Sequence, residues 1–478
     1  MKREFIINII LLFIINILIK PIYIFGVEAR IQDTVGTEAY GLYFFYFNFI
    51  FLFQFINDPG LQNWNAQYIP KNRVNIQSHF SNLLQIKFIL AFIFISIVCL
   101  SAFFLGYLDT WMIFFMAVNF VLSSLFMVFR GVVAGLGHYR SDSLLSSLDK
   151  LLMLFILGYL VWFSDYRDNF DIRFLIYGQT MAYLIACLVA FSLIIRKISL
   201  IFKPIRIEDI KTVIQSSAPY VLIMIFMTTY NKLDGVMLGW LLDDNNYQAG
   251  VYAAAYRFYD AANMVGYLFA ALLLPMYASE INDKNILKEL LDTGIKYTTS
   301  LSLVMLASIW FFGDDILKLL YSEYQPDFFK SLRFLMISYF MVATAYIYGT
   351  LLVATGNVKN LNIVFAAGLV VNIVLCLILI PSFKAVGASI ATLLTQILVM
   401  AGQIYLVKKQ MNIVISASEL RRIVSFALSI IGAFFILTAV LKIEWYLILG
   451  LCILICVLLS FIFKIINQKD LALIRNRK

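Results

Sequence analysis

The sequence predicts an all-α polytopic membrane protein with about 14 transmembrane helices. Three observations predict this class: 62% of the 478 residues are hydrophobic, only 14% are charged, and the apolar residues gather in long runs. Soluble domains are about 45–50% apolar. A chain this apolar therefore requires lipid around it rather than water.

Apolar runs long enough to cross a membrane follow one another along the chain. A spanning helix needs about 20 mostly apolar residues. The predicted spans are residues 5–25, 40–57, 87–108, 111–133, 148–163, 174–195, 218–242, 250–275, 293–312, 331–354, 361–381, 386–407, 422–441 and 444–463.

The distribution of charge predicts the orientation. If both termini are cytoplasmic, most of the 37 Lys and Arg residues fall in cytoplasmic segments such as 196–211 and 469–478. The outer loops instead carry acids such as Asp165, Asp168 and Asp243. This is the bias that the positive-inside rule describes, so we expect a multi-pass protein with both termini in the cytoplasm. The rule also accounts for the net charge of +9 without a nucleic-acid partner.

Two pairs of similar segments indicate an internal repeat. Gly41-x-Tyr43 opens the second predicted span and Gly250-x-Tyr252 opens the eighth. Residues 134–140 end the fourth span and residues 353–359 end the tenth. Both pairs relate span n to span n+6, as expected for two lobes that run in the same direction through the membrane.

The repeat predicts two six-helix lobes around a central cavity, followed by two C-terminal helices. The predicted parts are an N-terminal lobe at 1–196, a cytoplasmic linker at 197–217, a C-terminal lobe at 218–407, and the last two spans with a basic tail at 408–478. A central cavity between two lobes suits transport by alternating access.

Ionisable residues inside the predicted spans are the candidate functional residues. A charge at the bilayer centre costs about 2.5–3.5 kcal/mol on the insertion scale, so it should face a cavity or a partner. The candidate substrate-binding cations are Lys20, Lys232 and Arg257. We expect them to bind a phosphate or pyrophosphate group.

Acids and polar residues accompany these cations. Asp234 and Asp260 would couple to an ion or pair with the cations, and Asp58 with Arg130 could form a cytoplasmic gate. The polar and aromatic residues that share helix faces with them are Asn16, Tyr252, Tyr256 and Asn263. The alternatives are that Arg257 only pairs with Asp260, that Lys232 only neutralises Asp234 or Asp260, that Lys20 reaches the outer interface, and that the tyrosines only pack.

The sequence carries no pattern typical of a metal site or of catalysis. The two histidines are His79 and His138, and the five cysteines lie inside apolar runs without metal-ligand spacing. We find neither a phosphate-binding G-x-x-x-x-G-K-[ST] loop nor a Ser/His/Asp set. We therefore expect no metal, no cofactor and no enzymatic activity.

Several segments resemble the Wzx-type oligosaccharide flippases, which form a polysaccharide-biosynthesis family within the MOP exporter superfamily. The resembling segments are 35–43, 58–61, 230–234 and 250–257. Asp234 and Arg257 match charged positions of the family. Pro59 departs from the pattern, because the family more often has an aromatic residue between the Asp and the Gly of this turn.

The resemblance implies a transporter of the bacterial inner membrane that flips an undecaprenyl-pyrophosphate-linked oligosaccharide repeat unit from the cytoplasmic to the outer leaflet. The product would serve the assembly of surface polysaccharide such as lipopolysaccharide O-antigen, capsule or exopolysaccharide. Implied partners are membrane lipid, H⁺ or Na⁺, and a polysaccharide polymerase. A lipid II flippase, a multidrug or cation antiporter of the same superfamily, and a membrane enzyme of polysaccharide assembly are the alternatives.

Overall fold

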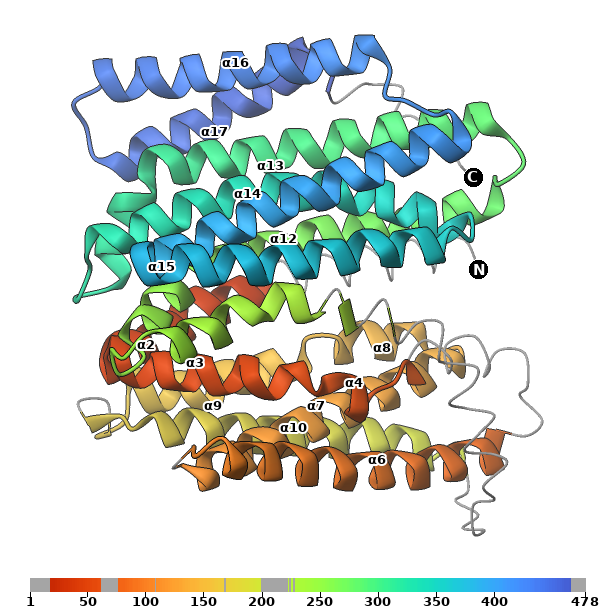
Figure 1. The fold of residues 1–478 in the computed structure, drawn as a ribbon, viewed down its shortest axis with the longest axis vertical. Helices are drawn as coiled ribbons and strands as arrows, with labels where there is room; N and C mark the ends of the chain where they lie inside the picture. The colour runs from red at the N-terminus through yellow and green to blue at the C-terminus, as the bar shows by residue number, and fades with distance from the viewer. Residues whose placement is uncertain are drawn as a thin grey trace. The chain divides into compact units, whose positions relative to one another are not determined.

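The computed structural model describes residues 18–61, 76–107, 109–166, 169–198, 222, 225–226 and 228–465. Every regular element assigned within these residues is a helix (Figure 1). The elements of the first half are η1 (Ile24–Glu28), α2 (Ala29–Val35), α3 (Thr37–Leu52), α4 (Gln54–Asn57), α6 (Ile76–Phe104), α7 (Thr110–Gly135), α8 (Tyr139–Leu145), α9 (Leu148–Trp162) and α10 (Ile172–Ile195).

The second half begins with helical residues 228–241. The elements that follow are α12 (Tyr247–Ser279), α13 (Lys284–Leu320), α14 (Pro326–Ala354), α15 (Val358–Met411), α16 (Ala417–Val440) and α17 (Trp445–Ile462). In Figure 1, helices α13 to α17 run side by side. Helix α14 packs against both α13 and α15, and α16 packs against α13 and α17.

Within the described residues, nine helices are long and apolar enough to cross a membrane. One of them, α15, has 54 residues and contains a non-helical residue, Lys384, with φ 54°. At 1.5 Å per residue a straight helix of that length would reach about 80 Å, far more than the roughly 30 Å of hydrocarbon. Two helices therefore meet at Lys384, and they correspond to the predicted spans 361–381 and 386–407.

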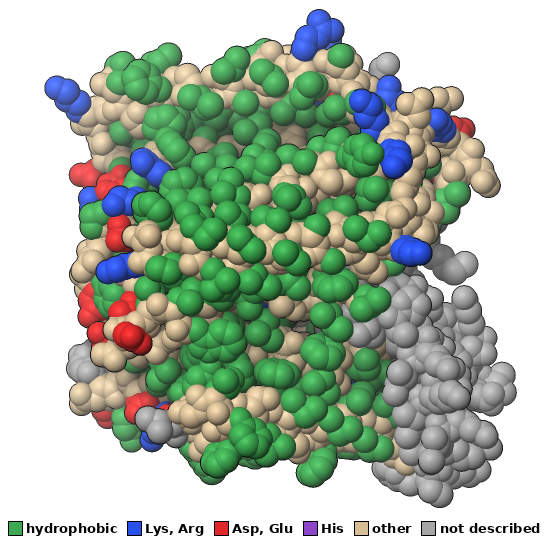
Figure 2. All heavy atoms as spheres, in the orientation of Figure 1, with side chains coloured by type: hydrophobic (Ala, Val, Ile, Leu, Met, Phe, Trp, Pro, Cys, Tyr) green, Lys and Arg blue, Asp and Glu red, His purple; other side chains and the backbone are tan. Residues whose placement is uncertain are grey.

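The outward-facing side chains suit a lipid environment. Large apolar residues such as Phe92, Phe104 and Phe435 are exposed. Figure 2 shows hydrophobic side chains along the helices of the visible face, with charged side chains near the helix ends. A water-soluble monomer rarely exposes so much contiguous apolar surface. The prediction of an all-α polytopic membrane protein is confirmed.

Contacts divide the chain into two compact units. Unit 1 comprises Met1–Gly239 with Asp244–Gly250, and unit 2 comprises Trp240–Asp243 with Val251–Lys478. The described helical residues up to Gly239 thus pack with unit 1. Of the predicted linker at 197–217, only residues 197–198 are described. The lobe boundaries 1–196, 218–407 and 408–478 stay a prediction.

The glycines of the repeated Gly-x-Tyr motif permit a close approach inside unit 1. A Cβ atom at Gly41 would lie 2.0 Å from the carbonyl oxygen of Asn246, and one at Gly250 would lie 2.0 Å from that of Thr37. The Gln32 amide also donates to the Gly250 carbonyl at 2.9 Å. The two motifs therefore need glycine because each one packs directly against neighbouring backbone.

A buried lysine ties α4, α6 and α7 together. The Lys87 side chain is 1% exposed. Its Nζ donates to the Asn57 carbonyl oxygen at 2.5 Å, to Asn57 Oδ1 at 3.0 Å and to Ser124 Oγ at 2.5 Å. Asn57 in turn donates to the Phe120 carbonyl at 3.1 Å. A buried ammonium is tolerated because these three acceptors take its hydrogen bonds.

We predict that Lys87→Ala destabilises the protein by about 3 kcal/mol or more, because it leaves three buried acceptors without a donor and opens a cavity. The midpoint of thermal unfolding in detergent measures this loss. Lys330→Ala is the matched control, since the Lys330 side chain is 60% exposed and pairs with Asp327 at the surface. Equal unfolding midpoints for the two variants would contradict the assigned role of Lys87.

Candidate functional site

The predicted cations of the first and seventh spans differ in their surroundings. Lys20 lies in the helical residues before η1, and its side chain is partly exposed. Asn16, predicted to share its face, lies outside the described residues. Lys232 lies in the helical residues 228–241, and its Nζ sits 5.8 Å from the Phe47 ring centroid and 5.4 Å from that of Phe51.

Close helix packing places Lys232 against these two rings of α3. A Cβ atom at Gly235 would lie 2.6 Å from Asn48 Nδ2, so the helix around Gly235 approaches α3 closely. Aromatic faces attract cations, by about 2 kcal/mol or more when water is excluded. Asp234, which is 1% exposed, lies on the same helix two residues from Lys232. Residues two apart on a helix do not face each other.

Arg257 is buried in unit 2 and contacts a partner that the sequence analysis missed. The side chain is 6% exposed, and its Nη1 donates to the hydroxyl of Tyr321 at the end of α13. The guanidinium carbon also lies 5.9 Å from the centre of the same ring. Asp260, by contrast, is exposed and makes no hydrogen bond or ion pair with the described residues. The structure therefore does not pair Arg257 with Asp260.

The predicted stripe on α12 has a buried and an exposed part. Tyr252 is 1% exposed and Tyr256 7% exposed. Their ring centroids lie 5.6 Å apart, and the Tyr252 hydroxyl lies 3.2 Å from Thr392 Oγ1 of α15. These tyrosines pack inside unit 2. Asn263 lies one turn beyond Asp260 and is only partly buried.

The two residues predicted to form a gate each have a local partner. Asp58 is 7% exposed and accepts a hydrogen bond from the Leu61 backbone N–H at 2.7 Å, closing a turn after α4. Arg130 on α7 forms an ion pair with Asp142 of α8 at 2.9 Å. The structure does not bring Asp58 and Arg130 together. A gating role for either residue stays a prediction.

The sequence analysis missed a lysine and a glutamate inside unit 1. Lys150 Nζ lies 5.1 Å from the centre of the Tyr23 ring and 5.9 Å from that of Tyr183. Glu28 accepts a hydrogen bond from the Tyr40 hydroxyl at 2.7 Å. Glu28 fell between two predicted spans and Lys150 near the start of another. Neither residue lies near the centre of a predicted span, so neither was chosen as a candidate.

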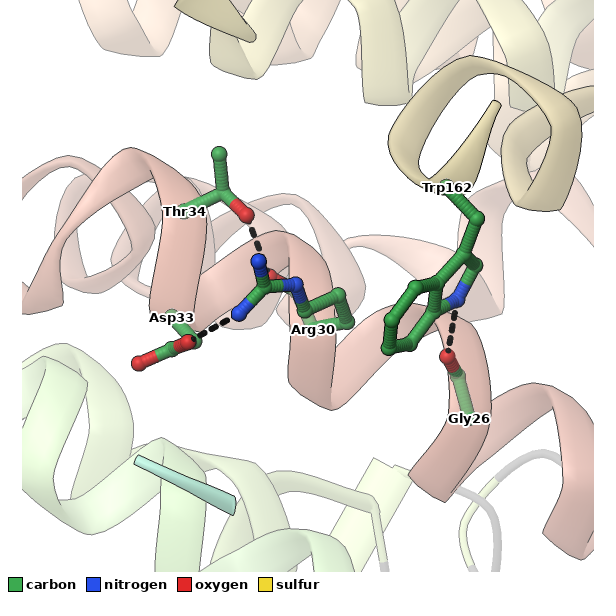
Figure 3. A network of polar contacts seen from close by, with 5 residues as sticks. All are labelled: Gly26, Arg30, Asp33, Thr34 and Trp162. Atoms are coloured by element: carbon green, nitrogen blue, oxygen red, sulfur yellow. Dashed lines mark hydrogen bonds and ion pairs between the residues drawn. The ribbon is translucent and has the colours of Figure 1, made fainter. Parts of the chain in front are cut away.

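Glu28 ends the π-helix η1. Figure 3 shows the contacts of Gly26 in this helix with Trp162, and of the neighbouring Arg30. The Trp162 indole N–H of α9 donates to the Gly26 carbonyl inside η1 at 2.8 Å. The Arg30 guanidinium lies 5.3 Å from the Trp162 ring centre and pairs with Asp33 at 2.6 Å. Single-turn π-helices inside α-helices are frequent at functional sites.

Charged residues also cluster where α13 ends, outside the predicted span 293–312. Burial raises the pKa of the Asp314 carboxyl. Hydrogen bonds from Lys318 and Tyr324 lower the pKa by more than burial raises it, so the net pKa lies below the usual range. Burial and the bond to Asp314 raise the pKa of the Tyr324 hydroxyl well above its ordinary value. These groups satisfy one another and are not candidates for substrate binding. Among the described residues, no group of three or more His, Cys, Asp or Glu residues is placed to hold a metal ion.

The sequence matches two family models. Residues 5–280 match the family described as "Polysaccharide biosynthesis protein", which is more than half of the chain. Residues 219–378 match the MatE family. A curated relative is an uncharacterized membrane protein of Methanocaldococcus jannaschii, 25% identical over 293 residues. That match covers 58% of this chain and 66% of the relative, so it spans just under two thirds of that protein.

Solved structures of low sequence identity share the fold. The lipid II flippase MurJ in an inward closed conformation has a TM-score of 0.75 at 14% identity, with 97% of this chain and 100% of MurJ covered. An inward-facing multidrug resistance MATE family transporter of the MOP superfamily has a TM-score of 0.66 at 14% identity, with 81% and 94% covered. A MOP superfamily transporter of Pyrococcus furiosus has a TM-score of 0.54 at 13% identity, with 84% and 94% covered.

The family match and the shared fold agree with the composition and the long apolar helices of the chain. The resemblance noted in segments such as 230–234 and 250–257 is thereby confirmed at the level of the family. The chain is a multi-pass membrane protein that belongs to the polysaccharide biosynthesis protein family, with the fold of the MOP superfamily of membrane transporters.

Proposed function

We propose that the chain flips an undecaprenyl-pyrophosphate-linked oligosaccharide repeat unit from the cytoplasmic to the outer leaflet by alternating access. The flipped unit feeds the assembly of surface polysaccharide, such as O-antigen, capsule or exopolysaccharide. The match to the polysaccharide biosynthesis family supports the sugar context, and the fold shared with a lipid II flippase supports a lipid-linked substrate. The observation that carries the proposal is the position of Lys232, a cation of the predicted seventh span, against two aromatic rings.

A cation inside the membrane suits the chemistry of the substrate. Pyrophosphate carries more than one negative charge, and its attraction to an ammonium group grows as the surrounding dielectric falls. Phe47 and Phe51 lower the cost of holding Lys232 there without cancelling its charge. Lys20 and Arg257 are the further cations proposed to serve the same group.

The remaining assignments follow from this proposal. Asp234, buried on the helix that carries Lys232, couples transport to H⁺ or Na⁺. Asp58 and Arg130 act at the cytoplasmic end of unit 1. The protein resides in a bacterial inner membrane with both termini cytoplasmic, as the distribution of Lys and Arg supports, and it hands its product to a polysaccharide polymerase.

Lipid II is the second candidate substrate. The match to MurJ covers 97% of this chain, whereas the match to the inward-facing MATE transporter covers 81%. A fold likeness at 14% identity supports a related architecture without choosing the lipid-linked sugar. A multidrug or cation antiporter is supported by the MatE match and by the fold shared with MATE transporters, and a membrane enzyme of polysaccharide assembly is the remaining alternative.

We predict that deletion of the gene abolishes surface polysaccharide and leaves lipid-linked oligosaccharide on the cytoplasmic leaflet. Wild type restores export, and Lys232→Ala lowers it at least about tenfold, because the anionic group loses an intramembrane partner. Lys232→Arg keeps the charge and the contact with the rings, so it retains most export. Surface polysaccharide and leaflet-resolved lipid-linked sugar are the measured quantities.

Lys330→Ala is the control for these variants, because it removes an exposed lysine of α14. Normal polysaccharide in the deletion strain together with altered sensitivity to cationic drugs would overturn the proposal in favour of a drug exporter. Cell lysis with accumulation of lipid II would instead select the second candidate substrate.

The buried position of Arg257 leads to a separate prediction. Arg257→Ala lowers export more than Arg257→Lys, because lysine keeps the charge near Tyr321. Tyr321→Phe removes only the hydrogen-bond partner, which is worth about 1.5–3 kcal/mol for a charged donor, and it lowers export by misplacing the guanidinium. Export per folded molecule and the thermal midpoint are measured together. Equal export by the alanine and lysine variants contradicts a substrate-binding role for Arg257.

A further inference from the structure

Helix α12 carries two residues, one exposed and one partly buried, whose acceptor oxygens the described chain leaves without donors. Asp260 is exposed and has no hydrogen bond or ion pair there. Asn263 Oδ1 is a buried atom without a hydrogen-bond partner in the described residues. Because the two residues are three apart on one helix, they lie on the same face.

Asp260 lies deep within its helix. At 1.5 Å per residue it is about 20 Å from the start of α12 at Tyr247 and about 28 Å from its end at Ser279. An exposed carboxylate at this depth is costly in hydrocarbon, and such groups face water-filled cavities or partners. Arg257, the cation one turn earlier, is buried and bonded to Tyr321. A carboxylate at this depth therefore needs water or a polar ligand beside it.

The chemistry of this face selects the class of ligand. An ionised carboxylate only accepts hydrogen bonds, and the free atom of Asn263 is also an acceptor. Pyrophosphate is itself anionic and rich in acceptors, so Asp260 repels it. A sugar presents several hydroxyl donors, and an amino sugar adds an ammonium group. A glycan with many hydroxyl donors therefore matches this face of α12, whereas a phosphate group does not.

An exposed aromatic ring lies on the same face. Tyr267 is seven residues after Asp260, which corresponds to two helical turns, and it is 64% exposed. Beside it, a Cβ atom at Gly266 would lie 2.9 Å from Cδ2 of Tyr346 on α14. The glycine thus leaves space for a second ring. Flat rings next to a few fixed polar groups are the usual composition of a small-molecule site.

We propose that Asp260, Asn263 and Tyr267 bind the glycan of the lipid-linked substrate. Asp260 and Asn263 accept hydrogen bonds from the sugar, and the Tyr267 ring packs on its apolar face. This inference rests on the proposed function, because it takes a lipid-linked sugar as the ligand. It assigns Asp260 to substrate recognition rather than to ion coupling or pairing, and it separates glycan binding by Asp260 from pyrophosphate binding by the cations Lys20, Lys232 and Arg257.

Binding of two lipids to the purified full-length chain in nanodiscs tests the assignment. The probes are undecaprenyl pyrophosphate and the same lipid carrying a hexose disaccharide. Wild type should bind the sugar-bearing lipid about tenfold more tightly than undecaprenyl pyrophosphate. One or two hydrogen bonds to a charged acceptor account for a difference of this size. Asp260→Ala should remove most of this gain without weakening the binding of undecaprenyl pyrophosphate, because the carboxylate repels that group.

Further variants separate recognition from folding. Tyr267→Leu should reduce the gain from the sugar while Tyr267→Phe keeps it, and neither threatens the fold because the ring is exposed. Asn263→Ala should act in the same direction as Asp260→Ala. Asp327→Asn is the control, since it removes an exposed carboxylate at the start of α14. A disaccharide of amino sugars should lose affinity in Asp260→Asn, whereas a neutral disaccharide keeps most of it.

Three outcomes overturn the inference in distinguishable ways. Equal weakening of both lipids by Asp260→Ala means that the carboxylate does not recognise sugar. Equal affinity of wild type for the two lipids means that no glycan site exists, although the proposed flippase function survives. Binding of neither lipid by wild type defeats the proposed function and the glycan site together.

Discussion

A polar group inside hydrocarbon must find its partner within the protein, because no water is present to replace that partner. The same need for partners inside the protein is met at the irregular points of the chain near the ends of the predicted spans. The π-helix η1 disturbs the regular backbone bonding of the first described helix, and the Trp162 indole satisfies the Gly26 carbonyl there. The short helix α4 ends at Asn57, whose carbonyl oxygen accepts a hydrogen bond from the ammonium group of Lys87.

The same constraint separates two kinds of intramembrane polar residue. Lys87 is buried among fixed acceptors of its own unit, so its charge stabilises one arrangement of helices. Asp260 is exposed without a described partner at similar depth in its helix. A side chain of the second kind is tolerated only where water or a ligand reaches it. The contacts of a polar residue in a transporter therefore indicate whether it stabilises the fold or binds a ligand. Its charge alone does not distinguish these roles.

Close helix packing supplies the rigidity on which these polar contacts depend. Gly41 and Gly250 each meet neighbouring backbone where any side chain would collide with it. Gly235 allows the helix that carries Lys232 to approach α3, whose aromatic rings then contact the cation. Small residues at helix contacts are common in membranes because van der Waals packing replaces the hydrophobic effect there. The glycines of the repeated motif thus serve packing.

The fold class could be predicted from the amino-acid sequence, because apolar runs of spanning length form transmembrane helices. Segments such as 230–234 and 250–257 indicated the family. The sequence also identified Lys232 and Asp260 as charges that need an explanation. Only the tertiary structure decided which charge met which partner. Helical periodicity tells which residues share a face, but not which neighbouring helix that face meets. The contact of Arg257 with Tyr321 joins residues of different helices far apart in the chain, and the exposure of Asp260 beside buried tyrosines depends on how α12 is rotated against its neighbours.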